Sequence, residues 1–373
     1  MKVLTLSYDG KLTSQGRQSK KELAMEECLR WPYGNGCVTT HRLGNVSPST
    51  YRQNPYLSSQ ALFTMQTIHY GWLAGCLLLA VACSSPQPPD RGTPATLVAH
   101  SEPDFGAYWY AGKAELSRYT LQQARYGSIH SGEAVLIFVT EDFLTDRQVK
   151  LESEPTNRSA PVLKLNLSRK FVTGIYDYSL FTSVFTPIQA DRFSRTLKVT
   201  TSVQDWCGQT YSQLNYRRNR YQVADHSYFQ NEADQQYAVE GTWLEDELWT
   251  RIRLGPQTLP TGEVRLIPGT ATARLRHQRL QPRAARAELR PFAGNEFAGT
   301  SLLAYTLTYP DRTLRIVFEK AFPHLIAGWE ETYADRNQTL TTRAVRTRTM
   351  RTDYWTKNAP QDTTLRTELG VKQ

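Results

Sequence analysis

The chain has 373 residues and a formal net charge of +9 at pH 7, with 40% hydrophobic and 21% charged residues. The part from Cys83 onward, about 290 residues, is long enough for one large domain or two small ones, with roughly 70–75% of its unfolded surface buried. Cys207 is the only one of the five cysteines that follows Cys83, so residues 84–373 exclude an internal disulfide.

The first segment, residues 1–64, lacks a sustained helical or strand periodicity and mixes Gly, Ser, Asn and Pro with scattered charges. This composition predicts an unstructured leader or a mis-assigned start rather than a folded domain. An apolar run follows over Gly71–Cys83, which carries no charge and is shorter than the roughly 20 residues that a membrane-spanning helix needs.

A chain begun at Met65 would place this run where an exported protein has its signal peptide, over 65–82. The run ends in Ala80-Val81-Ala82-Cys83, which resembles a bacterial lipobox. The resemblance implies a diacylglyceryl thioether on Cys83, cleavage before it and acylation of the new amine, for example by palmitate. Several acyl chains give stable membrane anchoring, whereas one gives marginal binding.

Two other interpretations of the apolar run stay open. Cys76 also follows a lipobox-like sequence, Leu73-Ala74-Gly75, but its use would leave a very short hydrophobic region, so Cys83 is preferred. The run would otherwise be a buried core helix or an uncleaved signal anchor. Residues 83–104 are rich in Pro, Ser and Thr and predict the lipidated cysteine with a flexible tether.

From residue 105 onward, short segments with alternating apolar residues and many β-branched residues predict strands. Residues 113–127 fit a helix or a strand, and the strand is favoured, while 133–143 is the clearest strand. The remaining predicted strands cover 149–152, 161–167, 174–186, 196–203, 210–216, 221–227, 264–268, 302–309, 313–320, 324–333 and 339–349.

One helix is predicted. Thr242-Trp243-Leu244-Glu245 matches a capping box, and Leu244, Leu248 and Ile252 recur at four-residue spacing to form an apolar face. Gly255 and Pro256 would end this helix.

The predicted fold is therefore mainly β, over residues 105–350. We expect antiparallel sheets that form a barrel, half-barrel or curved sandwich with one covering helix, preceded by the lipoprotein signal and flexible tether. Residues 351–373 are expected to be a flexible C-terminal tail. The chain has no βαβ alternation and no glycine-rich phosphate loop, which argues against a nucleotide-binding α/β fold.

Basic residues are concentrated in two arginine-rich segments, 265–290 and 336–351. Such patches occur in proteins that bind nucleic acids, but no nucleic-acid motif accompanies them here. We interpret both segments as solvated strand faces and expect no nucleic-acid partner.

The densest group of reactive side chains lies in residues 203–237. Cys207 and His226, with Asp205 to orient the imidazole, suggest a Cys/His nucleophilic site. The structural alternative, which we favour, is a hairpin of 210–216 and 221–227 in which Cys207 is a small buried hydrophobic residue.

The neighbouring residues Asp225, His226, Glu232 and Asp234 are of types that could bind a metal. Their spacing matches no zinc, calcium or metalloprotease motif, so no metal and no cofactor is predicted.

Aromatic residues in two further segments suggest a ligand mouth or partner surface. In β-rich domains such residues more often belong to the core or to cross-strand pairs, and this alternative is favoured. The candidate surface residues are Tyr108, Trp109, Tyr110, Tyr176 and Phe181, with Phe105, Tyr178 and Phe185 beside them.

Several segments together resemble a group of Bacteroidetes lipoproteins that often carry the name septum formation inhibitor Maf. They include FGAYWYAGKAELSRYTLQQARYG, EAVLIFVTEDF, KVTTSVQDWCGQTYSQLN, HSYFQNEADQQY, LEDELWTRIR and LPTGEVRLIP. True Maf proteins are α/β nucleotide pyrophosphatases with a Ser-x-Ser-Pro-Arg-Arg motif. The nearest match here, Ser84-Ser85-Pro86-Gln87-Pro88, lacks the arginine pair, so the resemblance implies export and supplies no catalytic residues.

The resemblance implies an outer-membrane lipoprotein that faces the periplasm, with the inner membrane as the alternative. We expect a non-enzymatic binding or envelope-structural module that contacts the bilayer through acylated Cys83 and binds an apolar ligand or an envelope protein. The alternative is a hydrolase, either of the Cys/His type or a nucleotide pyrophosphatase as the Maf name suggests.

Overall fold

The computed structural model describes residues 104–371. The predicted leader, signal peptide, lipidation site at Cys83 and nearly all of the tether lie outside the described residues. Among the residues described, no helix combines the length and the apolar character needed to cross a membrane.

The described chain forms one sheet of sixteen strands, so the prediction of a mainly β fold is confirmed. The sheet is open, and its strands follow the order β10-β11-β12-β13-β14-β15-β16-β1-β2-β4-β5-β6-β7-β8-β9, with β3 paired to β2. All neighbours are antiparallel except β10 and β11. The strands are β1 Ala114–Arg125, β2 Ser128–Leu144, β3 Val149–Lys150, β4 Ser159–Thr173, β5 Tyr176–Pro187, β6 Lys198–Asp205, β7 Gly208–Arg217, β8 Arg220–Ser227, β9 Gln235–Glu240, β10 Trp243–Leu244, β11 Gly262–Ile267, β12 Arg283–Pro291, β13 Leu302–Tyr309, β14 Arg312–Glu319, β15 Ile326–Asp335 and β16 Gln338–Thr352.

The strands are often longer than predicted because the turns between them are tight. Tyr126 and Gly127, both with positive φ angles, make the turn between β1 and β2, a backbone shape typical of two-residue hairpins. Strand β2 therefore begins at Ser128, before residue 133, where the sequence predicts the start of this strand. Strands β9, β10 and β12 were not predicted as separate elements.

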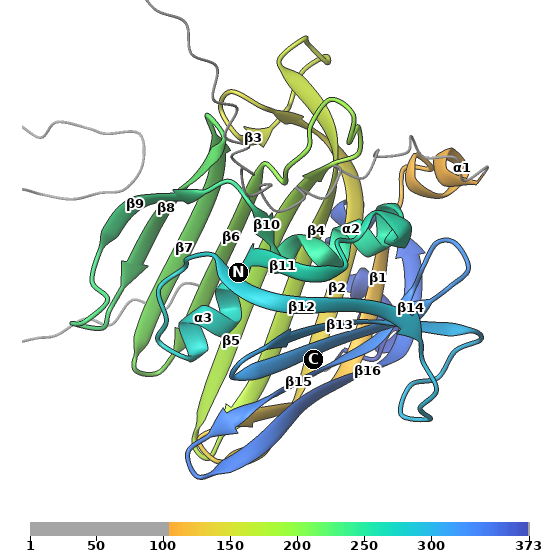
Figure 1. The fold of residues 1–373 in the computed structure, drawn as a ribbon. Helices are drawn as coiled ribbons and strands as arrows, with labels where there is room; N and C mark the ends of the chain where they lie inside the picture. Colours follow the sequence, from red (N-terminus) through yellow and green to blue (C-terminus); the bar gives the residue numbers. More distant parts are fainter. Residues whose placement is uncertain (1–103, 372–373) are drawn as a thin grey trace, which may run out of the picture. The chain divides into compact units, whose positions relative to one another are not determined.

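Two short helices, α2 (Leu248–Leu254) and α3 (Thr270–Leu275), lie inside the curl of the sheet (Figure 1). Trp249 of α2 packs edge-on against Trp329 of β15, with 5.1 Å between ring centroids. Arg253 of the same helix pairs with Glu115 of β1. The Thr250 hydroxyl of α2 also lies 2.6 Å from the Thr186 hydroxyl of β5, so the helix contacts strands on both sides of β1 in the sheet and holds the curl together.

The predicted helix is present, but its start differs from the prediction. Thr242 does not cap it, because its hydroxyl donates to the carbonyl of Arg265 at 2.6 Å. The backbone N–H of Leu244 instead donates to the carboxylate of Glu247 at 3.0 Å, and a 3-10 turn, η1 (Glu245–Glu247), precedes α2. A second 3-10 turn, η2 (Pro256–Thr258), follows the predicted end at Gly255.

Helix α3 corrects the interpretation of the arginine-rich segment 265–290 as a continuous strand face. The segment contains the end of β11, α3 and the first part of β12. The helix is held by tertiary bonds, since the N–H of Thr270 donates to the buried carboxylate of Asp246 at 2.9 Å. In the other arginine-rich segment, Arg346 on β16 pairs with Glu319 on β14.

The prediction of a flexible C-terminal tail is wrong for residues 351–371. Strand β16 continues to Thr352, and the chain then forms η3 (Tyr354–Thr356), η4 (Pro360–Thr363) and α4 (Thr364–Leu369). Leu369 is buried against Ala114 and Leu116 of β1. The start of β1 is therefore covered on both faces of the sheet, and burial of this apolar side chain stabilises the end of the chain.

The two edges of the sheet are strands β9 and β10, which follow each other in the chain. Only Gly241 and Thr242 separate them. An ion pair between Arg265 of β11 and Glu240 of β9, at 2.5 Å, links the β9 edge to the strand that pairs with β10. Both edge strands are short, which limits the unpaired backbone that they present.

Candidate ligand-binding cleft

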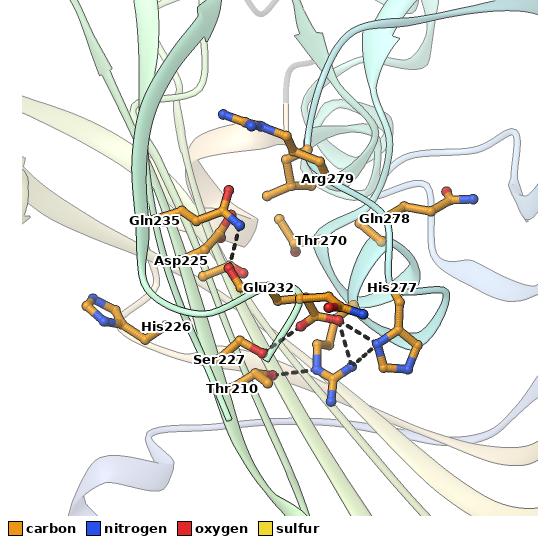
Figure 2. Close-up of a pocket in the computed structure, with 15 residues that line it drawn as sticks. Thr210, Asp225, His226, Ser227, Glu232, Gln235, Thr270, His277, Gln278 and Arg279 are labelled. Atoms are coloured by element: carbon orange, nitrogen blue, oxygen red, sulfur yellow. Dashed lines mark hydrogen bonds and ion pairs between the residues drawn. The ribbon is translucent and has the colours of Figure 1, made fainter. Parts of the chain in front are cut away.

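A polar cleft of about 280 Å³ lies between α3 with the residues after it and the strands β7, β8 and β9. Figure 2 shows Asp225 and Gln235 on one side and His277 and Gln278 on the other. The first side comes from β8 and the start of β9, and the second comes from the turn that ends α3. The curl of the sheet thus brings together two segments that are distant in sequence.

Glu232, in the β8–β9 loop, is the centre of a hydrogen-bond network at the floor of the cleft. The Ser227 hydroxyl donates to one carboxylate oxygen at 2.6 Å, and His277 Nδ1 lies 2.5 Å from the other. Burial opposes ionisation of Glu232, but the hydrogen bonds from Ser227 and His277 and the charge of Arg274 outweigh it. Together they lower the pKa of Glu232, so its charge is already compensated.

Arg274, on α3, is held in place from three directions. Its Nε donates to the Thr210 hydroxyl at 2.9 Å, and its Nη1 lies 3.9 Å from Glu232. Its guanidinium also stacks over the ring of Phe229, 4.4 Å from the centroid. These contacts make Arg274 a rigid part of the cleft wall.

Asp225 has an unused acceptor. One carboxylate oxygen accepts a hydrogen bond from the Tyr237 hydroxyl at 2.9 Å. The other, Oδ1, is buried and has no hydrogen-bond partner among the described residues. Buried polar atoms are nearly always paired, so an unpaired carboxylate oxygen in a cleft indicates a place for a donor from outside the chain.

Arg279 lies at the mouth of the same cleft. Its guanidinium stacks on the Tyr237 ring at 3.9 Å from the centroid, and the hydroxyl of the same tyrosine donates to Asp225. Within residues 104–371 Arg279 forms neither a hydrogen bond nor an ion pair. Its N–H donors therefore stay available in the cleft whose lining also contains the unused acceptor of Asp225.

Among residues 104–371 no hydrogen bond joins Cys207 and His226, the two residues of the candidate Cys/His site. The structure confirms the hairpin of β7 and β8, in which Arg217 pairs with Arg220 at the turn. Cys207 lies in the β6–β7 turn and is exposed, so the expectation that it is a buried hydrophobic residue is wrong. Asp205 accepts hydrogen bonds from the N–H groups of Cys207 and Gly208, at 2.7 and 3.1 Å, and so holds the turn.

His226, the predicted base, is engaged elsewhere. Its Nδ1 lies 3.3 Å from Asp234, and its ring stacks on Tyr211. Among residues 104–371 no three or more His, Cys, Asp or Glu side chains are placed to hold a metal ion. Asp225 and Glu232, considered for that role, instead belong to the cleft described above, and His226 lines its rim.

The five aromatic residues singled out in the sequence do not form one surface. Trp109 is in the core, and the Tyr108 hydroxyl donates to Glu115. Tyr176 packs against Tyr178, whereas Tyr110 and Phe181 are exposed on separate elements. The favoured alternative, that most of these rings are structural, fits Trp109, Tyr108 and Tyr176.

The sequence indicates the residues on the β8 side of the cleft but not those on the α3 side. Asp225, His226 and Glu232 lie in the segment identified as the densest in reactive groups. Arg274 and Arg279 were interpreted as part of a solvated strand face. In the sequence, only the positive charge of segment 265–290 indicates Arg274 and Arg279. Their position in the same cleft as Asp225 depends on how the whole sheet curls.

A second group of charged residues is buried beneath the helices, away from the cleft. Arg253 donates two hydrogen bonds of 2.5 Å to Glu115, and each side chain is 1% exposed. Arg312 pairs with Glu245 and, at 3.0 Å, with Glu331. All of these groups have partners, so they are structural rather than a binding site.

Comparisons with known protein families, curated proteins and solved structures gave no match to this chain.

Proposed function

We propose that this protein is a membrane-anchored, periplasm-facing binding module without enzymatic activity, whose ligand site is the cleft between α3 and strands β7–β9. The observation that carries the proposal is the buried, unpaired Oδ1 of Asp225 in a cleft whose lining also contains the available donors of Arg279. The membrane anchor at Cys83 and the periplasmic location rest on the lipobox and on the family resemblance.

The rigidity of the cleft supports binding. Arg274, Glu232, Ser227 and His277 hold one another through hydrogen bonds and ion pairs before any ligand arrives. A site whose groups are already ordered loses little conformational entropy on binding, which favours affinity.

The structure also changes the expected type of ligand. An apolar ligand would need an apolar cavity inside the curl, but α2 and α3 fill that space with side chains of the main core. The cleft is lined by carboxylate, guanidinium, imidazole, amide and hydroxyl groups, together with the apolar side chains of Ala273 and Leu280. We therefore propose a polar ligand in place of an apolar one.

The two enzymatic alternatives have less support. Cys207 and Asp205 lie in the β6–β7 turn, whereas His226 pairs with Asp234, so no nucleophile–base contact joins them. A pyrophosphatase of the Maf type would need an α/β architecture, but fourteen of the fifteen paired neighbours described here are antiparallel.

The test combines location and binding in the full chain. We expect radiolabelled palmitate to be incorporated by the wild type and not by Cys83→Ala. We also expect native mass spectrometry of the protein extracted from membranes to detect a bound small molecule, which is lost in the double variant Asp225→Asn/Arg279→Gln. Equal labelling of both proteins would overturn the anchor, and a bound molecule retained by the double variant would overturn the cleft as the site.

A further inference from the structure

We infer that the cleft binds a neutral, polyhydroxylated ligand the size of a single sugar ring. This inference rests on the proposed function, because it takes the cleft as the ligand site and assigns the chemical class of its occupant.

The charge balance of the cleft favours a neutral ligand. Its lining contains two carboxylates, Asp225 and Glu232, and two guanidiniums, Arg274 and Arg279. Glu232 and Arg274 are already compensated within the network, which leaves one carboxylate oxygen, on Asp225, and one guanidinium, on Arg279, in the lining of the same cleft. An anion or a cation would satisfy one of these two groups and be repelled by the other.

Hydroxyl groups can bind both the carboxylate oxygen and the guanidinium. A hydroxyl donates its proton to a carboxylate oxygen and accepts a hydrogen bond from a guanidinium, so neighbouring hydroxyls of a sugar can bind Asp225 Oδ1 and Arg279 together. Hydrogen bonds of this kind to charged groups contribute more than those between neutral groups. Ser212, Gln278 and Asn231 add neutral hydroxyl and amide groups to the lining.

The size and the lining of the cleft further restrict the chemical class of the ligand. Its volume of about 280 Å³ is near the lower end of the roughly 300–1,000 Å³ range of small-molecule pockets, which suits one ring rather than an extended chain. The lining, within the described residues, contains no Phe, Tyr or Trp side chain. The rings of Phe229 and Tyr237, which contact lining residues, are each covered by an arginine, at 4.4 and 3.9 Å from the centroid. Neither covered face is available for stacking on an aromatic ligand, so recognition here depends on hydrogen bonds.

An amino acid is the strongest competing ligand, since its ammonium could bind Asp225 and its carboxylate Arg279. The structure favours the sugar because the unpaired buried atom is a single acceptor, which one hydroxyl satisfies. Arg279 is exposed, so solvent would weaken its ion pair with the carboxylate of an amino acid. A charged ligand would lose more hydration on entry than a neutral one. The experiment separates the two classes.

The test is saturation-transfer NMR on the full chain with single named compounds. The sugar probes are N-acetylglucosamine, glucose, galactose and ribose, and the amino-acid probes are alanine and glutamate. We expect saturation transfer to at least one sugar, with affinity reduced about tenfold or more in Asp225→Asn and in Arg279→Gln, because each change removes a hydrogen bond to a charged group.

The matched control is Asp177→Asn, an exposed aspartate on β5 that does not line the cleft, and it should bind like the wild type. Thermal unfolding of each variant checks that the fold is kept. Sugar binding that is unchanged in Asp225→Asn overturns the inference, as does the absence of transfer to any sugar.

The outcomes also separate this inference from the proposed function. Amino-acid binding that is lost in Asp225→Asn overturns the sugar class and keeps the cleft as a ligand site. No binding of any probe, together with no co-purified molecule in native mass spectrometry, overturns both.

Discussion

Two regions of the molecule contain similar charged side chains, but these side chains differ in burial and in how completely they are paired. Beneath α2, Arg253 and Glu115 are almost completely buried and each satisfies the other. In the cleft beside α3, Glu232 and His277 keep 25% and 47% of their side-chain surface exposed, and Asp225 retains an unpaired oxygen. Completed pairs fix the position of a helix, whereas an incomplete set leaves an acceptor available to a ligand.

The difference follows from what surrounds each group. Arg253 lies against the rings of Trp109 and Phe138 and is 1% exposed, so an unpaired charge there would be very costly. The groups of the cleft lie near the β9 edge of the sheet, where solvent reaches them. Four predictions test this contrast, from the largest expected effect to the smallest.

Replacing Arg253 by methionine should destabilise the fold by about 3–5 kcal/mol, because it leaves the Glu115 carboxylate buried without its partner. Urea unfolding followed by tryptophan fluorescence measures the change. The double variant Glu115→Leu/Arg253→Met should recover much of the loss, since it removes both charges. A single variant that is within about 1 kcal/mol of the wild type would show that the pair does not hold α2 as described.

Replacing Asp246 by asparagine should stabilise the protein at neutral pH. Burial, opposed by the hydrogen bond from Thr270 and reinforced by Glu245, raises the pKa of Asp246 from 3.8 to about 6. The native state therefore holds this proton more tightly than the unfolded state does. Stability from this group is fully present below about pH 4 and is lost as the pH rises toward 6.

The asparagine variant keeps an acceptor for the Thr270 N–H and carries no charge. Its advantage over the wild type should grow between pH 4 and pH 6 to about 1–3 kcal/mol and then stay constant. Urea unfolding at several pH values measures it, with Asp177→Asn as the exposed control. An advantage that is independent of pH would contradict the assignment to Asp246.

Replacing Asp225 by asparagine should leave the free energy of unfolding within about 0.5 kcal/mol of the wild type, because the residue is half-buried at an open cleft and asparagine still accepts the Tyr237 bond. The same change should reduce the affinity for the ligand about tenfold or more. Thermal unfolding and ligand-observed NMR on one sample separate the two effects. A large loss of stability would place Asp225 among the structural groups instead.

The smallest effect is expected for Cys207→Ser, which should change neither the fold nor the binding, since the thiol lies exposed in a turn. The thiol should react with a colorimetric thiol reagent in the native protein, so the variant should titrate one thiol fewer than the wild type. Protection of this thiol until unfolding would contradict its exposed position.

The sequence predicts the strands well where a strand is amphipathic and its turn is short. Residues 302–309 and 313–320 were predicted as a hairpin and correspond to β13 and β14 nearly residue for residue. Alternating burial is a local property, so a local pattern reveals it. Helix α3 is different, because Thr270–Leu275 depends on bonds to Asp246 and Thr201 from other elements.

The cleft could be predicted only in part for a related reason. Asp225 and Glu232 lie in the segment of the sequence that is densest in reactive groups. The pairing of the predicted hairpin places this part of the segment near Thr210. The approach of Arg274 and Arg279 requires the curl of the whole sheet, which no local pattern encodes. Cys207 and His226 were proposed from their chemistry alone, and their positions in a turn and on a strand keep them apart.

The short passage from β9 to β10 has a consequence for association between copies of this protein. An open sheet normally offers two independent borders, and either can recruit a strand from another molecule. Here both borders belong to one stretch of chain with two residues between them, Gly241 and Thr242, so a strand added to one border would crowd the other. The domain thereby gains much of the protection of a closed barrel against edge-to-edge polymerisation, while its sheet remains hydrogen-bonded as an open one.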